Sequence, residues 1–276
     1  MKHSSDDPGT GKASSGEARP DTSRPGRARL DRLLVDRGLV PSRERAQALI
    51  LAGRVLVDEQ KVEKPGHAVA VTAAVRLLGE DLRYVGRGGL KLEAAIEHWK
   101  IDLNGKFCLD VGASTGGFTD CMLQHGAGRV LAIDTGYGQI ADRLRRDPRV
   151  ALMERTNARK LTPGELAAGI EFLAMDVSFI SATLVLPAVL AAIGGDSLLE
   201  AVILVKPQFE AGRENVGKGG IVRDPAAHRL AIERVRACAA KAGGRNLEMI
   251  DSPILGAEGN KEFLLHAVMR QSPQET

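Results

Sequence analysis

Apolar and polar residues alternate differently in three parts of the chain. Residues 1–26 are rich in Ser, Gly, Pro, Asp and Arg without apolar periodicity, which predicts a disordered leader. Residues 27–82 hold short amphipathic segments, whereas residues 83–276 alternate helical patterns with continuous apolar runs. Continuous apolar strands between helices are typical of a mostly parallel sheet that is covered on both faces. We therefore expect a small α+β domain over 27–82 and a larger α/β domain over 83–276.

The segment 27–82 shows helix signals followed by strand signals. Pro41 and Ser42 mark a helix start, and Gly38 and Gly53 mark helix stops. The elements predicted here are helices over 28–39 and 42–53 and strands over 55–57 and 69–78. Two short helices should therefore precede a small hairpin-like sheet.

The larger domain contains seven apolar runs of strand length. They are predicted as strands over 107–111, 129–133, 150–153, 172–175, 201–205, 247–250 and 263–269. The last two are expected to be antiparallel, because only a short turn through Gly256 and Gly259 separates them.

Composition narrows the class of protein. Hydrophobic residues make up 43% and charged residues 26%, as in an ordinary globular protein. The cysteines Cys108, Cys121 and Cys238 lie far apart without metal-ligand spacing, so neither a disulfide framework nor a metal site is expected, and Cys121 should belong to a helix core. No apolar run approaches the roughly 20 residues that span a bilayer, and the start of the chain lacks a secretory signal. We expect a cytoplasmic protein without a membrane contact.

Positive charge is concentrated in the smaller domain, although the whole chain carries only +3. Seven arginines face three acids between residues 27 and 54, and the candidate phosphate contacts among them are Arg29, Arg32, Arg43, Arg45 and Arg54. Charge alone leaves open that these are simply solvated helix surfaces. Aromatic residues make up only 3%, so a grip on RNA by shape and phosphate contacts fits better than base stacking.

Four motifs of this segment resemble the RNA-binding module named after the fourth small-subunit ribosomal protein. They are Arg29-Leu30-Asp31, Ser42-Arg43-Glu44-Arg45-Ala46, Leu49-Ile50 and Gly53-Arg54-Val55-Leu56-Val57. The resemblance covers about fifty residues and implies an αL-type fold that grips structured RNA. Such a module carries no chemistry of its own.

A glycine-rich turn follows the strand predicted at 107–111 and opens a helix. Its candidate cofactor contacts are Asp110, Gly112, Ala113, Ser114, Thr115, Gly116, Gly117 and Phe118. An acid at the strand end would repel a pyrophosphate but can receive a cationic cofactor, so the turn favours S-adenosylmethionine over NAD. Asp134 ends the next strand and can accept hydrogen bonds from ribose hydroxyls. Asn157 could reach the adenine, although its position fits a turn former equally well.

Four ionisable residues lie at or near the ends of predicted elements, where open α/β sheets place their active sites: Lys91, Asp176, Lys206 and Glu262. Lys206 directly follows an apolar strand and must find a carboxylate, because burying an unpaired charge is costly. Asp176, on the strand expected beside it, would supply that carboxylate. Any one of the four could be an ordinary surface ion pair, whereas the four in their motifs predict a catalytic group.

Further motifs resemble the TlyA family of haemolysin-like RNA methyltransferases. They are residues 87–92, the glycine loop and residues 134–139, 154–159, 206–210 and 258–263. The resemblance implies an FtsJ-like, Rossmann-like class I methyltransferase domain with a seven-stranded, mostly parallel sheet and S-adenosylmethionine as cofactor. It implies 2′-O-methylation of ribosomal RNA, free or in ribosomal subunits, by a Lys-Asp-Lys-Glu tetrad. The tetrad maps onto Lys91, Asp176, Lys206 and Glu262, with Glu258 competing for the last position. Lys206 would act either as a neutral base or as a charged group that stabilises the alkoxide.

Three alternatives stay open at this level. A pore-forming haemolysin is disfavoured by the missing signal and spanning segment. A nucleobase amino methyltransferase is disfavoured because residues 176–179 lack the two prolines typical of that class. The third alternative is an RNA-binding or assembly factor whose methyltransferase domain is inactive. Lys218 and Arg223 are further candidate RNA contacts, at a glycine-rich segment that fits a mobile loop or a simple glycine turn equally well. The sequence does not fix the oligomeric state, for which a monomer is favoured.

Overall fold

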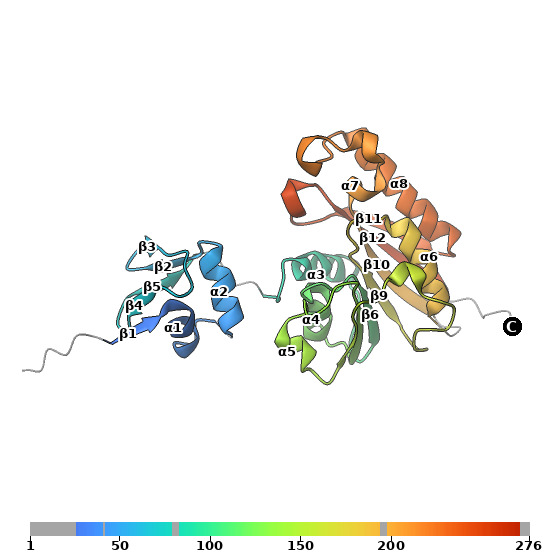
Figure 1. Cartoon of the computed structure of the whole chain (residues 1–276). Coiled ribbons are helices and arrows are strands. Elements are labelled where there is room, and N and C mark those ends of the chain that lie inside the picture. Colours follow the sequence, from blue (N-terminus) through green and yellow to red (C-terminus); the bar gives the residue numbers. More distant parts are fainter. Residues whose placement is uncertain (1–25, 41, 79–82, 194–197, 271–276) are drawn as a thin grey trace, which may run out of the picture. The chain divides into compact units, whose positions relative to one another are not determined.

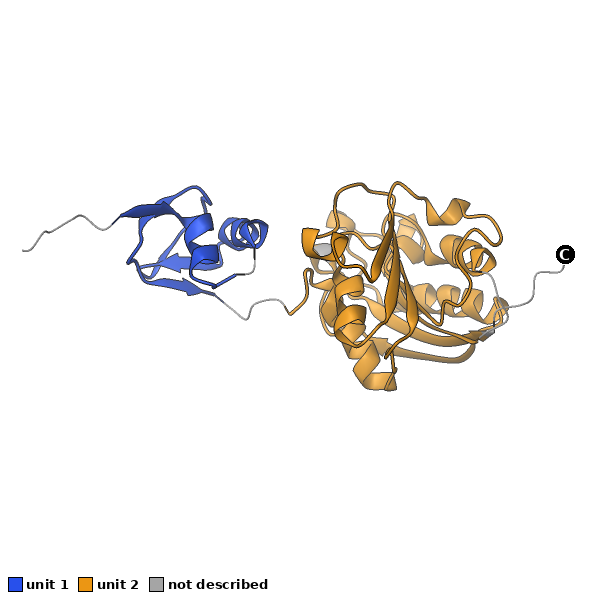
Figure 2. Ribbon diagram, turned by 90° about the horizontal axis from the view of Figure 1, so that it is seen from below, with its two compact units in different colours: residues 1–81 blue, residues 82–276 orange. Residues whose placement is uncertain are grey.

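The computed structural model describes residues 26–40, 42–78, 83–193 and 198–270. The chain forms two compact units, residues 1–81 and residues 82–276 (Figures 1 and 2). The leader predicted over 1–26, apart from Gly26, and the helix-starting Pro41 lie outside the described residues. No helix in the described ranges combines the length and apolar character that crossing a membrane requires.

The first unit is a small α+β fold around one apolar core. In chain order its elements are β1 (Arg27–Arg29), α1 (Leu30–Asp36), α2 (Arg43–Leu51), β2 (Val55–Val57), β3 (Gln60–Lys61), β4 (Ala68–Ala70) and β5 (Val75–Leu77). Leu30, Leu34 and Ile50 from the two helices are completely buried together with Val55 of β2. Ser42 caps α2, since its hydroxyl accepts a hydrogen bond from the backbone N–H of Arg45 at 3.2 Å.

Two details of the predicted first unit are wrong. The single strand expected over 69–78 is two strands in different sheets, because β4 pairs with β1 and β5 pairs with β2. The first helix begins at Leu30, and Ala28 belongs to β1 instead. A three-residue strand with arginines at both ends offers no apolar alternation, so periodicity could not identify β1.

The second unit contains a seven-stranded sheet and its helices. The strands are β6 (Phe107–Val111), β7 (Arg129–Ile133), β8 (Val150–Met153), β9 (Phe172–Met175), β10 (Leu198–Val205), β11 (Arg245–Asp251) and β12 (Phe263–Arg270). The helices are α3 (Gly88–Trp99), α4 (Gly117–Gln124), α5 (Asp142–Arg145), α6 (Ala182–Ala192), α7 (Pro207–Glu210) and α8 (Pro225–Lys241). Short 3₁₀ turns lie at Ala158–Lys160, Arg213–Asn215, Lys218–Gly220 and Ala257–Gly259.

The sheet order is β11-β12-β10-β9-β6-β7-β8, and β12 runs in the direction opposite to the other six strands. This arrangement confirms the seven-stranded, mostly parallel sheet and the antiparallel last pair. The chain winds from β6 toward β8 on one side and from β9 toward β11 on the other. The strand order therefore reverses between β6 and β9, and open sheets of this kind bind ligands at the carboxyl ends of the strands at such a point.

Helices cover both faces of the sheet (Figure 1). One core joins the sheet to α3 and α4 through residues such as Leu92 and Met122, and the other joins it to α6 and α8 through residues such as Leu186 and Val235. Neighbouring residues of one strand enter opposite cores, as Cys108 and Leu109 of β6 do, because side chains alternate across a strand. This burial on both faces explains the continuous apolar runs in the sequence.

Candidate active site and cofactor cavity

Two cavities lie at the carboxyl edge of the sheet. The first, here called the glycine-loop cavity, has a volume of about 310 Å³ and lies at the ends of β6, β7 and β9. The second, here called the lysine cavity, has a volume of about 560 Å³ and lies toward the end of β10 and the start of β12. Both cavities are lined by Ser114, Asp176, Ser178 and Phe179. They therefore adjoin where β9 ends.

The glycine loop is shaped by close backbone contacts. Gly112 has φ +90°, and a Cβ atom there would lie 2.3 Å from the backbone oxygen of Asp176. Gly116 has φ +94°, and its Cβ would lie 2.3 Å from Leu144. Only glycine fits positions that combine such a φ with so little space. The loop is thereby packed directly against the segment that carries Asp176.

Asp134 closes the loop from the neighbouring strand. Its Oδ2 accepts a hydrogen bond from the backbone N–H of Ser114 at 2.8 Å, and its Oδ1 accepts one from Gly136 at 2.6 Å. The carboxylate also lines the glycine-loop cavity. Since a carboxylate oxygen can accept more than one hydrogen bond, Asp134 can hold the loop and still receive ribose hydroxyls.

The predicted cofactor contacts divide into two groups. Gly112, Ser114, Asp134 and Asn157 line the glycine-loop cavity, whereas Asp110, Ala113, Thr115, Gly116, Gly117 and Phe118 are absent from its wall. The Asn157 side chain also accepts a hydrogen bond from the backbone N–H of Arg159 at 3.1 Å and caps the 3₁₀ turn there. Both roles that the sequence left open for Asn157 are therefore compatible with its position.

Asp110 and Phe118 lie beneath the loop. Phe118 is 3% exposed and belongs to the core with α3 and α4. Asp110 is completely buried, and its Oδ2 accepts a hydrogen bond from the Thr119 hydroxyl at 2.6 Å. Among the described residues its Oδ1 has no hydrogen-bond partner. Burial raises the pKa of Asp110 to about 7. A direct cofactor contact by either side chain stays a prediction.

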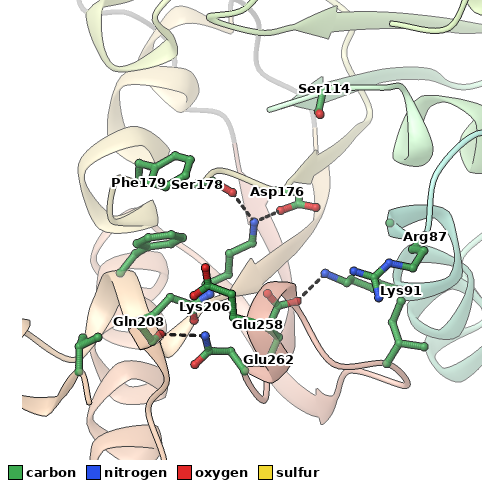
Figure 3. Close-up of a pocket in the computed structure, with 16 residues that line it drawn as sticks. Arg87, Lys91, Ser114, Asp176, Ser178, Phe179, Lys206, Gln208, Glu258 and Glu262 are labelled. Carbon is green, nitrogen blue, oxygen red and sulfur yellow. Dashed lines mark hydrogen bonds and ion pairs between the residues drawn. The ribbon is translucent and has the colours of Figure 1, made fainter. Parts of the chain in front are cut away.

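All four predicted tetrad residues line the lysine cavity, where they form two ion pairs (Figure 3). The Nζ of Lys91 lies 2.5 Å from Oε2 of Glu262, and the Nζ of Lys206 lies 2.5 Å from Oδ1 of Asp176. Lys206 also donates a hydrogen bond to the Ser178 hydroxyl at 2.7 Å. Both lysines are 8% exposed and Glu262 only 2%. Water is thus largely excluded from both amines.

Four different elements deliver these side chains. Lys91 lies in the first turns of α3, Asp176 and Lys206 follow the paired strands β9 and β10, and Glu262 directly precedes β12. The expected placement of Asp176 beside Lys206 on neighbouring strands agrees with this pairing. Glu210, from the same motif as Lys206, lies elsewhere: its carboxylate accepts hydrogen bonds from Ser181 and from the backbone N–H of Ala182 at the start of α6.

A buried asparagine holds the wall of the lysine cavity together. Asn260 is 2% exposed, its Oδ1 accepts a hydrogen bond from the backbone N–H of Val222 at 3.0 Å, and its Nδ2 donates one to the Gly220 oxygen at 2.9 Å. It therefore ties the glycine-rich loop at 217–220 to the segment before Glu262.

Several residues of the lysine cavity were not named as site residues in the sequence analysis, although some lie in its quoted motifs. They are Arg87, Ser178, Phe179, Gln208, Phe209, Val216, Gly220, Ile254 and Asn260. Phe179 is 92% exposed, has φ +63°, and its ring centroid lies 5.5 Å from that of Phe209. A bulky residue in this backbone conformation is uncommon and points to a functional constraint. The low aromatic content had argued against base stacking, and no sequence signal separates this pair from core aromatics.

The arginines of the first unit are organised by a buried acid. Asp31 is 0% exposed, and its carboxylate accepts hydrogen bonds from Arg29 at 2.9 and 3.1 Å, from Arg43 at 2.9 Å and from Gln47 at 3.1 Å. These donors hold the pKa of Asp31 well below its usual range, Arg29 most of all. Arg29 and Arg43 keep about half of their side chains exposed.

The other candidate RNA contacts are placed as follows. Arg32 is 77% exposed and lies 3.8 Å from Asp36, and the Nε of Arg54 donates a hydrogen bond to the Leu78 oxygen at 2.9 Å. Arg45, Lys218 and Arg223 are exposed or partly exposed. RNA contact by any of these residues stays a prediction.

The cysteines and the candidate metal ligands of the described residues were compared with the site. All three cysteines are free, and burial raises the pKa of Cys121 to about 12, so this thiol stays protonated. Cys121 is completely buried in α4, which confirms its place in a helix core. Across the described ranges, no group of His, Cys, Asp and Glu residues is arranged to hold a metal ion.

The residues of the glycine-loop cavity suit an adenosyl cofactor. Val111, Ile133 and Ala158 offer apolar walls for a purine, and Asp134 offers a carboxylate for a ribose. Asp176, at the junction of the two cavities, places a negative charge where a cationic sulfonium would meet its acceptor. The fold and the site together define an S-adenosylmethionine-dependent methyltransferase.

Comparison with known proteins places the chain more closely. Residues 84–269 match the FtsJ-like methyltransferase family and residues 28–75 match the S4 domain. The chain belongs to the FtsJ-like methyltransferase family and carries an S4 domain ahead of the catalytic unit. This membership confirms the predicted family, fold class, enzyme class and cofactor.

Relatives match over most of the chain. A "16S/23S rRNA (cytidine-2'-O)-methyltransferase TlyA" of Mycobacterium tuberculosis is 45% identical over 83% of this chain and 85% of its own length. "Hemolysin A" of Brachyspira hyodysenteriae is 40% identical over 84% and 96%. The solved structure of a Streptococcus thermophilus protein described as a candidate hemolysin has a TM-score of 0.66, with 41% identity and 90% of each chain covered.

Proposed function

We propose that this protein transfers a methyl group from S-adenosylmethionine to the 2′-hydroxyl of a cytidine in ribosomal RNA. One observation carries the proposal: the Lys206–Asp176 ion pair lies where the glycine-loop cavity meets the lysine cavity. A cofactor in the first cavity and a ribose in the second would then meet at this pair. The choice of cytidine and of ribosomal RNA rests on the names of the relatives from Mycobacterium tuberculosis and Campylobacter jejuni.

For this methyl transfer the protein must align the ribose hydroxyl with the methyl group and remove the hydroxyl proton. The bound cofactor supplies an electrophilic methyl group on a positively charged sulfur. In the proposed arrangement the ribose hydroxyl binds at the Lys206 amine, and its proton passes to the Lys206–Asp176 pair, where the amine or the carboxylate takes it up. The oxygen–methyl bond would form as the sulfur–methyl bond breaks, and the sulfur would leave as a neutral thioether. Ser178 holds the amine in place through its hydroxyl. The Lys91–Glu262 pair fixes the opposite wall of the cavity.

The S4 domain would supply the grip on structured RNA, with the arginines around Asp31 facing phosphates. Arg29, Arg32, Arg43, Arg45 and Arg54 are the proposed contacts in this domain, and Lys218 and Arg223 those in the catalytic unit. Because ribosomal RNA is the substrate, we place the protein in the cytoplasm, and we propose that it acts as a monomer.

Transfer of tritiated methyl groups to ribosomal subunits tests the proposal. Subunits assembled from unmodified, transcribed RNA are incubated with the parent and with Lys206→Ala, and the product is mapped by mass spectrometry. We expect a fall of about 10²- to 10⁴-fold in turnover, as general acid–base catalysis typically contributes, with unchanged cofactor affinity. Lys241→Ala, an exposed lysine at the end of α8, is the matched control and should label like the parent. Equal labelling by Lys206→Ala and the parent would refute the assignment.

A further inference from the structure

Glu258 is the carboxylate of the lysine cavity for which the proposed reaction has no use. It competes in sequence with Glu262 for the fourth tetrad position, and the structure pairs Glu262 with Lys91. Glu258 is exposed, lines the cavity and has neither an ion pair nor a hydrogen-bond partner among the described residues. In Figure 3 it lies between Lys206 and Glu262, among the other side chains of the cavity.

The backbone presents this carboxylate in an unusual way. Glu258 has φ +59° and ψ 9°, a left-handed conformation that glutamate rarely adopts. A Cβ atom on Gly220 would lie 2.8 Å from its Oε2, so the carboxylate lies against the loop at 217–220. That loop is itself tied down by Asn260. Strained conformations of this kind persist where the surroundings impose them, and they cluster at ligand sites.

The charge of Glu258 restricts what it can bind. A carboxylate repels the phosphates of RNA, so its partner in the same cavity must be a hydrogen-bond donor on the nucleotide. The Phe179 and Phe209 rings line this cavity and offer apolar surface to a base. Of the two pyrimidines, cytosine presents its exocyclic amino group where uracil presents the O4 acceptor. An ionised carboxylate is acceptor-only, so at this position of the ring it discriminates between the two.

We propose that Glu258 is a specificity-determining residue that accepts a hydrogen bond from the exocyclic amino group of the target cytosine and so excludes uracil. This inference rests on the proposed function. A matched hydrogen bond to a base edge typically discriminates by about tenfold or more. Glutamine at this position can turn its amide to donate to uracil O4 as well as accept from cytosine, so it removes the discrimination without changing the shape of the side chain.

The test compares two substrates and three proteins. Ribosomal subunits carry either cytidine or uridine at the position mapped in the previous experiment, and kcat/KM is measured for the parent, Glu258→Gln and Glu214→Gln. Glu214 is an exposed glutamate that does not line the cavity, so its variant makes the same change of charge outside the site. We expect the parent and Glu214→Gln to prefer cytidine at least about tenfold, and Glu258→Gln to lose most of that preference. Cofactor affinity should be equal in all three.

Each other outcome identifies what has failed. An unchanged cytidine preference in Glu258→Gln would overturn the inference. An equal loss of kcat/KM on both substrates would overturn it too and would assign Glu258 to the reaction or to folding. Lost cofactor binding in Glu258→Gln would likewise show a structural role. A parent that methylates a nucleoside other than cytidine would overturn the inference and leave a ribose methyltransferase standing. A parent that methylates no subunit would overturn the proposed function itself.

Discussion

Lys91 and Glu262 form an ion pair from which water is almost excluded, with side chains 10% and 2% exposed. Bringing two charges out of water is costly, and their attraction roughly offsets that cost only while both are present. The Lys91–Glu262 pair therefore serves mainly to fix the Lys91 amine at the cavity wall and contributes little net stability. The same reasoning applies to Lys206 and Asp176, although the Asp176 side chain is 20% exposed.

Removing one partner of the Lys91–Glu262 pair should therefore destabilise the protein. We expect Glu262→Leu to lower the free energy of unfolding by about 3 kcal/mol or more, because Lys91 stays buried without its carboxylate. The double variant Lys91→Met/Glu262→Leu should regain most of that stability and remain inactive. Urea denaturation of the four proteins of this cycle measures both effects.

The matched control for this cycle is an exposed ion pair on the same unit. Lys261 lies 2.8 Å from Asp251, and their side chains are 47% and 63% exposed. Asp251→Asn should cost less than about 1 kcal/mol, as surface ion pairs generally do. A Glu262→Leu variant that loses no more stability than Asp251→Asn would contradict the interpretation of the buried pair.

Asp110 predicts a pH dependence of stability. Burial raises its pKa to about 7, above the roughly 3.9 of an unfolded chain. Between these values the folded state binds more protons than the unfolded state, so the free energy of unfolding falls as the pH rises through this window. Asp110→Asn removes the titration, and its amide oxygen can still accept the hydrogen bond from Thr119. The variant should therefore gain stability relative to the parent between about pH 4 and pH 7. Urea denaturation across this range would contradict the argument if the difference stayed constant.

Individual site residues were predictable from the sequence where a charged residue directly follows a buried strand and also lies in a motif. Lys206 was predictable because a lysine directly after a buried strand needs a carboxylate, and Asp176 ended a strand that was expected beside it. Ser178 and Phe179 were not predictable. They lie at a backbone turn where Phe179 has a positive φ, and no pattern in the sequence indicates such a turn. The choice between Glu258 and Glu262 likewise required the position of Lys91 in space.

Among the elements, the central strands of the large sheet were predicted to the residue. Strands β6, β7 and β9 match the predicted ranges because burial on both faces makes each a largely apolar run, and the half-buried edge strand β8 matches its predicted range as well. Strands β10 and β11 are longer than predicted, since their added residues are mostly exposed or half-buried and so interrupt the apolar pattern. In the first unit only β2 matches its predicted range of 55–57, and the pairing of its short strands could be known only from the structure.

The turn between β6 and α4 is where one added carbon should matter most. In Gly112→Ala the new Cβ would meet the Asp176 backbone oxygen at 2.3 Å, and the residue would also be held at φ +90°. We expect weaker cofactor binding, lower kcat and a lower Tm, because Asp176 must move. Calorimetric titration with S-adenosylmethionine and thermal denaturation measure these changes.

Gly105→Ala is the control that distinguishes backbone strain from a displacement of Asp176. It has φ +71°, a Cβ atom there would meet no other atom within 4 Å, and it lies between α3 and β6 at the opposite end of the sheet. Gly105→Ala should lose about 1–2 kcal/mol of stability from the left-handed backbone alone, with cofactor affinity unchanged. Equal loss of cofactor affinity in both variants would show that the contact with Asp176 is not the cause.

The two units have separate cores and carry different features. The first unit is held by its own apolar cluster around Leu30 and Ile50, and the second by the two clusters on either face of the sheet. Both cavities lie entirely in the second unit, whereas the concentrated arginines lie in the first. Cofactor binding and RNA affinity should therefore respond to different substitutions.

Salt dependence of RNA binding is the measurement that tests this division. Each phosphate contact that is lost should flatten the slope of log affinity against log salt by about 0.9. We expect Arg32→Ala, which removes a 77% exposed guanidinium, to flatten the slope for ribosomal RNA by about this amount and to leave cofactor affinity unchanged. Arg76→Ala is the matched control, because Arg76 in β5 is held by Glu59 at 2.6 Å in an exposed ion pair outside the motifs of the S4 domain. It should leave the slope unchanged. An equal change of slope in both variants would show that the net charge of the unit, and not the predicted arginine surface, determines RNA affinity.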